Sequence, residues 1–162
     1  MAKTYINING ESRDASQITV PQDRTFRDAW FFDGDSVEID TTKKQEILSG
    51  MVNEEREKRL KAGTSITVTG YGDIPMQGRD QDQITTLALE ASASALKAQG
   101  VTSASLPFRD AANGNHMLTP DQTLELMGKA KKFAQDIYQA AWALKDDPAG
   151  IPDDFTEDKY WP

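Results

Sequence analysis

The chain has 162 residues, of which 38% are hydrophobic and 27% are charged, and it carries a net charge of -8. This length and composition predict one compact domain, or one domain with a small appendage. The negative charge disfavours nucleic acid and anionic membrane surfaces as partners, because both repel an acidic protein. The chain contains no cysteine, which excludes disulfide bonds, a thiol nucleophile and a cysteine-based zinc site.

Targeting segments are not evident in the sequence. Residues 1–11 contain no apolar core of a signal peptide, and no apolar run approaches the roughly 20 residues that a membrane span requires. We therefore expect a soluble protein without membrane insertion, made in a cytoplasm.

Residues 1–40 predict strands and turns. A β-prone run at 5–8 precedes Asn9-Gly10, a pair typical of tight hairpin turns, and a second short run at 18–20 ends at Pro21. A further hairpin is predicted where two apolar runs flank an Asp-Gly turn. Those runs and their turn are 30–32, 37–39 and Asp33-Gly34-Asp35.

A helix is predicted over 41–62. Thr41 or Thr42 can cap its start, and Gly63 is a natural C-cap. Its first half carries an apolar stripe at helical spacing, and its second half is almost entirely charged, with several pairs four residues apart. The stripe consists of Ile47, Leu48, Met51 and Val52.

The middle of the chain predicts a hairpin followed by a second helix. Residues 64–78 alternate in the manner of strands around a glycine-containing turn, and Pro75 makes the returning strand an edge. Residues 80–99 form the helix, which Gly100 ends. One face of this helix is small and rich in alanine, so a partner could approach it closely; it comprises Ile84, Leu87, Ala88, Ala91 and Ala95.

A third hairpin and a long helix follow. Asn113-Gly114 marks the hairpin tip within 105–118, and Thr119 and Pro120 open a helix over 120–145. The helix carries a stripe with heptad-like spacing, which favours either a buried core helix packed on 80–99 or self-association through that face. The stripe consists of Leu124, Met127, Ala130, Ala134, Ile137, Ala141 and Leu144.

Candidate chemical groups are few. His116 is the only histidine, so one chain cannot build a His-based catalytic pair or zinc cluster, and no Gly-x-Ser-x-Gly elbow supplies a serine nucleophile. We interpret His116 as a surface or hydrogen-bonded loop residue. Asp33, Asp35 and Glu38 could offer oxygen ligands to calcium, but the twelve-residue loop pattern is missing and a solvated turn is favoured.

Other acidic and glycine-containing motifs are also better explained without chemistry. Asp146-Asp147 and Asp153-Asp154 could pair for acid–base catalysis, yet a charged helix end and a solvated arm are the simpler interpretation. Gly70 and Gly72 are not followed by the residues of a phosphate loop. The sequence therefore predicts no catalytic residue, no cofactor and no metal site, and we expect no enzyme.

Three segments resemble bacteriophage proteins. Residues 21–30, Pro-Gln-Asp-Arg-Thr-Phe-Arg-Asp-Ala-Trp, resemble the opening of many small phage and prophage tail proteins, with Asp28 where Asn is usual. Residues 53–63 resemble the start of an uncharacterised phage domain often found at the C-terminal ends of tail fibre proteins. Residues 142–148, with the closing Trp161-Pro162, are similar to the C-terminal phrase of phage tail assembly chaperones.

The second of these resemblances extends furthest along the chain. The phage domain continues as a hairpin, an arginine before an alanine-rich helix, a second hairpin and a long helix, an order that Arg79 and 82–98 fit here. Its second hairpin usually carries tryptophan, whereas this chain has Phe108 there. Because a family resemblance is not a physical warrant for a role, what it implies is an expectation.

We expect an α+β fold in which small antiparallel β-hairpins pack on two or three helices. Its expected parts are a strand-rich docking region at 1–40, a helix-hairpin-helix-hairpin-helix phage tail domain at 41–147, and an extended acidic and aromatic arm at 148–162. The resemblance implies a non-enzymatic virion protein of the distal tail, at the baseplate, tail tip or fibre base. It would occupy the virion tail, and the host cytoplasm during assembly.

The implied partners are other phage tail proteins and further copies of the chain, in a trimer or hexamer. The alternative is a tail or tail-fibre assembly chaperone that is absent from the mature virion, and a cell-wall hydrolase is disfavoured. The arm packs on the chain or hangs free, and removing it after Pro148 should weaken assembly and leave the fold intact. The candidate contact residues are Trp30, Phe31, Phe32, Phe155, Tyr160, Trp161, Met127, Ala134, Ile137 and Ala141.

Overall fold

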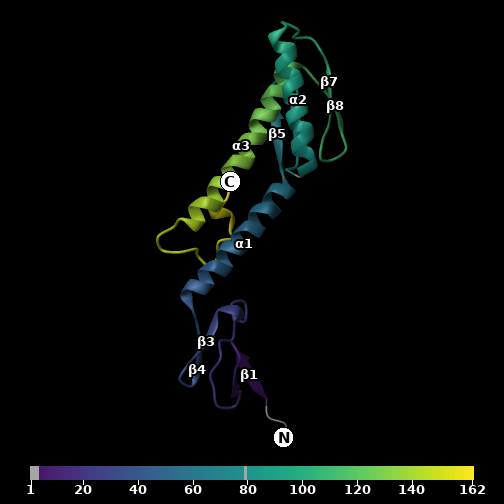
Figure 1. Cartoon of the computed structure of the whole chain (residues 1–162). Coiled ribbons are helices and arrows are strands. Elements are labelled where there is room, and N and C mark those ends of the chain that lie inside the picture. Colours follow the sequence, from purple (N-terminus) through teal and green to yellow (C-terminus); the bar gives the residue numbers. More distant parts are fainter. Residues whose placement is uncertain (1–3, 79) are drawn as a thin grey trace.

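The computed structural model describes residues 4–78 and 80–162, without the side chains of 80–83. Arg79, which the phage resemblance singled out, lies outside the described residues. Within them, the fold is α+β, as predicted: three α-helices combine with four two-stranded antiparallel sheets. The molecule is elongated, with the N-terminal hairpins at one end and the second helix at the other (Figure 1).

Two hairpins form the N-terminal region. Strands β1 (Tyr5–Ile8) and β2 (Glu11–Asp14) pair around Asn9-Gly10, which both have positive φ, as the tight turn requires. The predicted strand at 18–20 is wrong, because this turn pairs 11–14 directly with 5–8. Thr19 instead makes an isolated parallel bridge to Ser36, which ties the two hairpins together.

The second hairpin joins β3 (Trp30–Asp33) to β4 (Ser36–Ile39), as predicted. A single 3-10 turn, η1 (Arg27–Ala29), precedes it. Alternation along β3 buries Trp30 and leaves Phe31 exposed. We refer to residues 4–40 as the N-terminal module.

Helix α1 (Thr41–Ala62) begins one residue earlier than the predicted cap implies. The side chain of Asp40, and not Thr41 or Thr42, accepts hydrogen bonds from the backbone N–H groups of Thr42 and Lys43, at 2.9 and 3.0 Å. Gly63 ends the helix with a φ of 72°, as predicted. The strands β5 (Thr64–Val68) and β6 (Gly72–Met76) follow as the predicted hairpin.

The remaining elements form the other end of the molecule. Helix α2 (Asp80–Ala98) and the hairpin of β7 (Leu106–Arg109) and β8 (Asn115–Leu118) precede helix α3 (Pro120–Lys145). Thr119 caps α3 in a reciprocal capping box with Gln122, and Pro120 is its first residue, as predicted. A short turn, η2 (Asp158–Tyr160), lies near the C-terminus.

Helix α3 connects two hydrophobic clusters. Its first half packs with β5, β6 and β8 through Leu126 and Met127. Its second half packs on α1 and on the C-terminal segment through Ile137, Ala141 and Leu144. The heptad-like stripe of α3 is therefore the core of this chain, which is the first of the two interpretations of that stripe.

The C-terminal segment 148–162 folds back along α1. Lys44 forms an ion pair with Asp153, and the Gln45 side chain accepts a hydrogen bond from the Ile151 N–H group at 2.7 Å. Phe155 and Trp161 enter the cluster between α1 and α3. The segment is not extended, contrary to the prediction, because turns at 148–149 and 153–156 and the 3-10 turn η2 reverse its course; of the two arrangements considered for it, the structure shows packing on the chain.

Candidate functional site

The β7–β8 hairpin carries the single histidine, and a tight loop shapes its tip. The Oδ1 atom of Asp110 accepts hydrogen bonds from the backbone N–H groups of Ala112 and Gly114, at 2.9 and 2.6 Å. Asn113 takes a positive φ of 66°, which asparagine tolerates well. The predicted Asn113-Gly114 tip is thus held closed by the carboxylate of Asp110.

His116 links this hairpin to the β5–β6 hairpin. Its Nε2 atom lies 2.8 Å from Asp110 Oδ2, and its Nδ1 atom lies 3.1 Å from the Tyr71 hydroxyl. The side chains of Asp110 and His116 are 6% and 15% exposed, so the bond between them is partly shielded from water, whereas the bond to Tyr71 is exposed. His116 is hydrogen-bonded, as interpreted from the sequence, but it lies on strand β8 and not in a loop.

Asp110 is held in its ionised form at this position. The hydrogen bond to His116 lowers the pKa of Asp110 below its ordinary value, and the backbone N–H groups of Gly114 and Ala112 act in the same direction against the effect of burial. An ionised Asp110 accepts from Nε2–H of His116, and in the neutral imidazole Nδ1 then accepts from the Tyr71 hydroxyl. Both carboxylate oxygens and both ring nitrogens are therefore engaged within the chain, and the cluster braces the two hairpins.

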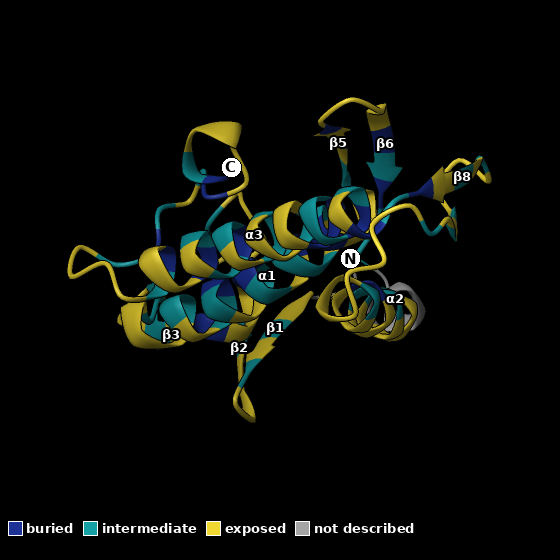
Figure 2. Cartoon of the chain, turned by 90° about the horizontal axis from the view of Figure 1, so that it is seen from above, coloured by how far each residue is buried: buried dark blue, intermediate teal, exposed yellow. Residues whose placement is uncertain are grey.

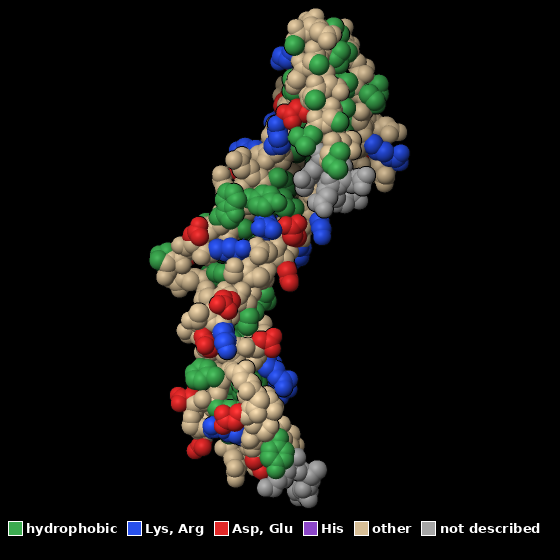
Figure 3. Space-filling view, in the orientation of Figure 1, with side chains coloured by type: hydrophobic (Ala, Val, Ile, Leu, Met, Phe, Trp, Pro, Cys, Tyr) green, Lys and Arg blue, Asp and Glu red, His purple; other side chains and the backbone are tan. Residues whose placement is uncertain are grey.

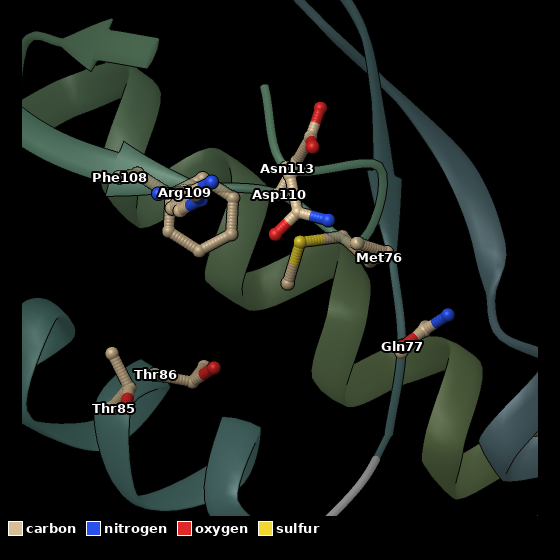
Figure 4. Close-up of a pocket in the computed structure, with 9 residues that line it drawn as sticks. Met76, Gln77, Thr85, Thr86, Phe108, Arg109, Asp110 and Asn113 are labelled. Carbon is tan, nitrogen blue, oxygen red and sulfur yellow. The ribbon is translucent and has the colours of Figure 1, made fainter. Parts of the chain in front are cut away.

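A cavity of about 270 Å³ lies beside this cluster, between β6, α2 and the β7–β8 hairpin. In Figure 4 the side chains of Met76, Phe108 and Asp110 lie on one side of it, and Thr85 and Thr86 of α2 lie on the other. The lining is mixed: Phe108 and Met76 are apolar, whereas the threonines and Arg109 are polar.

Several of the acidic groups considered as ligands or catalysts have other partners. Glu38 accepts from the Ser36 hydroxyl, and Asp153 and Asp154 pair with Lys44 and Lys159. Among the residues that the structure describes, no group of three or more His, Asp or Glu side chains is placed to hold a metal ion. In the same part of the chain, no helix is long and apolar enough to cross a membrane.

The candidate contact residues fall into two groups. Eight of them contribute to the chain's own packing: Trp30, Phe155, Trp161, Met127, Ile137 and Ala141 are buried, and Ala134 and Tyr160 pack against the core. Tyr160 is half-buried, and its hydroxyl donates to Asp154 at 2.9 Å. We correct the assignment of the buried six to an interface, because a side chain without exposed surface cannot meet a partner unless the core opens.

The remaining candidates lie on the N-terminal module. Phe31 is exposed, and Phe32 is half-buried beneath the guanidinium of Arg13, which lies 4.4 Å from the ring centre. The structure adds exposed apolar side chains that the sequence analysis did not single out as contacts. These are Tyr5, Tyr71, Ile84, Leu87, Val101, Met117 and Trp142.

Most of the chain matches a known protein family. Residues 39–159 match the model of a family described as a domain of unknown function, DUF4376. The chain belongs to the DUF4376 family. The DUF4376 match begins at the end of β4, so it takes in all three helices and most of the C-terminal segment and leaves the two N-terminal hairpins outside. No curated protein and no solved structure matches the chain.

Proposed function

We propose that this chain is a non-enzymatic structural protein of a bacteriophage tail. It belongs to the distal tail, at the baseplate, tail tip or fibre base, where it binds other tail proteins and self-associates. The resemblances of 21–30 and 53–63 to phage tail proteins support this proposal. The DUF4376 domain itself has no known function and is neutral between this role and others.

One structural observation carries the docking role. The N-terminal module precedes the DUF4376 region and extends from one end of the molecule (Figure 1). It exposes two aromatic side chains, Tyr5 on β1 and Phe31 on β3. Exposed aromatic residues are favoured anchors in protein interfaces, because they bury a large area at a small cost in side-chain entropy.

The module is fixed to the helical part, so a load on it reaches the rest of the molecule. At the point where α1 begins, the Asp40 side chain of the module accepts hydrogen bonds from the Thr42 and Lys43 N–H groups of the helix, at 2.9 and 3.0 Å. Phe26 and Ala29 enter the core cluster of α1, and Lys44 lies 4.8 Å from the centre of the Phe26 ring. A rigid junction of this kind suits a tail component better than a free linker would.

Mass spectrometry of purified phage particles tests the proposal, with the copy number referred to the major tail protein. We expect the chain in the particles at a fixed multiple of three or six, as tail symmetry requires. Absence from particles, together with co-purification with a tail protein from infected cells, would favour the assembly chaperone. Absence from both would overturn the phage tail role.

Variants of the module test the docking surface. Phe31→Ser and Tyr5→Ser should reduce incorporation of the chain into particles, since both remove exposed aromatic area without touching the core. Met117→Ser is the matched control, because it removes an exposed apolar side chain from β8, outside the module. Equal incorporation of all three variants would contradict docking through the N-terminal module.

A further inference from the structure

Helix α2 is apolar on two opposite faces, of which the fold uses one. Leu89, Ala93 and Leu96 turn towards α3, and Ala93 is completely buried. The other face is the small, alanine-rich one that the sequence analysis described as open to close approach by a partner, and on it Ile84 and Leu87 are 70% and 61% exposed. Positions two residues apart lie about 200° apart on a helix, so the two stripes point in opposite directions.

The exposed face lies open on the surface of the molecule. Ala88, Ala91 and Ala95 accompany Ile84 and Leu87 on it, and all three are exposed. Figure 2 shows α2 largely in the colour of exposed residues, and Figure 3 shows apolar side chains gathered over this end of the molecule. A helix that is apolar on both sides is normally covered on both sides.

In the part of α2 whose side chains are described, the charges are turned away from this face. Within 84–98 the charged residues are Glu90 and Lys97, and both form ion pairs with α3. Glu90 lies 2.5 Å from the Lys131 ammonium, and Lys97 lies 2.6 Å from Asp121. A partner recognised by its charge would find nothing complementary here.

A second copy of this chain fits such a face. Each copy carries a net charge of -8, so two copies repel one another over most of their surface and can approach where charge is absent. Ile84, Leu87, Ala91, Ser94 and Ala98 follow one another at intervals of three and four, the spacing that lets helices pack along a common seam. The alanines and serine allow close approach of the two backbones.

We propose that the exposed face of α2 is the seam through which copies of this chain associate, α2 against α2. This inference deepens the self-association in the proposed function, and it moves the seam from α3, where the sequence placed it, to α2. An apolar groove of about 240 Å³ between α2 and α3 continues the surface, lined by Leu87, Ala130, Ala134 and Tyr138 among others. Ala134, a predicted contact residue, lies at this groove.

The size of the face sets the expected strength of association. Nineteen residues give α2 a length of about 28 Å, so one helix face is smaller than the roughly 800 Å² per partner of a standard interface. A contact of this size, extended by the groove, fits micromolar association. Sedimentation equilibrium of the full chain from about 1 to 100 µM should therefore show a mass of two or more chains.

Substitutions and single cysteines locate the seam. Ala91→Glu places a carboxylate in the centre of the face and should shift the chain to monomer, whereas Met117→Glu, which adds the same charge at an exposed apolar site on β8, should not. Because the chain has no cysteine, Ala91→Cys reports directly on the distance between α2 helices. We expect a disulfide-linked dimer of Ala91→Cys on mild oxidation and little of one for Met117→Cys.

The outcomes separate this inference from the proposed function. Circular dichroism matching that of the unchanged chain shows that the variants fold. A chain that stays monomeric up to about 100 µM overturns the seam, and so does an oligomer that Ala91→Glu leaves intact and Ala91→Cys does not cross-link. In either case a fixed copy number in particles would still support the tail role, while absence from particles would remove that role and leave an observed seam standing.

Discussion

The Nε atom of Arg59 lies 2.8 Å from Oε1 of Glu55, one turn earlier on α1, and this pair holds a carboxylate that is 7% exposed. Arg59 also donates to the Thr156 carbonyl at 2.8 Å, and its guanidinium lies 5.1 Å from the centre of the Trp161 ring. One side chain thus compensates a buried charge and joins α1 to the C-terminal segment.

Arg59→Ala should lower the free energy of unfolding by about 2–3 kcal/mol, because it leaves a buried carboxylate poorly compensated. Lys58→Ala is the matched control, since Lys58 pairs with the same carboxylate and is 75% exposed; it should cost less than about 0.5 kcal/mol. Urea denaturation measures both. Equal losses for the two variants would show that Arg59 has no special role.

Removal of residues 149–162 should abolish cooperative thermal unfolding. The cut deletes Ile151, Phe155 and Trp161 from the core and exposes the surfaces of α1 and α3 that they cover. Losing several large buried side chains costs at least about 5 kcal/mol, comparable to the whole stability of a small domain. The expectation that a chain cut after Pro148 keeps its fold is therefore replaced, and a sharp melting transition monitored by circular dichroism would restore it.

Trp161→Phe and Trp30→Phe should differ although both tryptophans are buried. The indole N–H of Trp161 donates to the Phe155 carbonyl at 2.7 Å, whereas within the described residues the Trp30 indole N–H has no hydrogen-bond partner. Trp161→Phe should cost about 1–2 kcal/mol more than Trp30→Phe in chemical denaturation, because it removes the donor to a buried carbonyl. A larger loss of unfolding free energy for Trp30→Phe would contradict the assignment of the Trp30 indole N–H as unpartnered.

Asp110 should contribute to stability in a pH-dependent way. Its pKa in the folded chain is lowered from 3.8 by the hydrogen bond from His116, so its contribution is fully present above the unfolded value and is lost as pH falls through the folded value. Asp110→Asn should therefore make the acid limb of a plot of unfolding midpoint against pH less steep. Asp35→Asn, on the exposed β3–β4 turn, controls for the loss of one negative charge. If it changes the acid limb by the same amount, Asp110 makes no specific contribution to the pH dependence.

Alanine substitutions at Gly50, within α1, and at Gly63, which ends the helix, should change the stability in opposite directions. At Gly63, with φ at 72°, an added Cβ would lie 1.9 Å from the Met76 carbonyl oxygen, so Gly63→Ala should cost several kcal/mol or prevent folding. At Gly50, an exposed helical position with no atom within 4 Å of such a Cβ, Gly50→Ala should stabilise by about 0.5–1 kcal/mol. Thermal melts compare the two, and a stabilised Gly63→Ala would contradict the close approach of β6.

Local signals in the sequence predicted the elements well. Gly63, the Asn9-Gly10 turn and the Thr119 capping box act over a few residues, and each lies where it was expected. The cap of α1 was missed by one residue, because Asp40, Thr41 and Thr42 are all good capping residues and only the backbone geometry separates them.

Longer-range relationships were beyond the sequence. Spacing shows that α2 carries apolar stripes, but it cannot tell whether Leu89 or Leu87 meets α3, because that depends on how the helix is rotated against its neighbour. His116 was correctly predicted to be hydrogen-bonded, yet Tyr71 lies 45 positions away and no local pattern connects them. The burial of Phe155 and Trp161 likewise depends on a reversal of the chain direction, which the acidic, proline-rich sequence of this segment does not predict.

Helix α3 runs through both hydrophobic clusters, with Met127 in one and Ile137 in the other. The two ends of the DUF4376 domain are therefore not independent folding units. Opening either cluster unpacks one half of α3, the helix on which the other cluster also depends. The domain should open as a whole, with the slowest-exchanging amide protons in α3 at the junction between the two halves. Cutting the molecule into a smaller working fragment at any point along α3 would leave both pieces without a complete core.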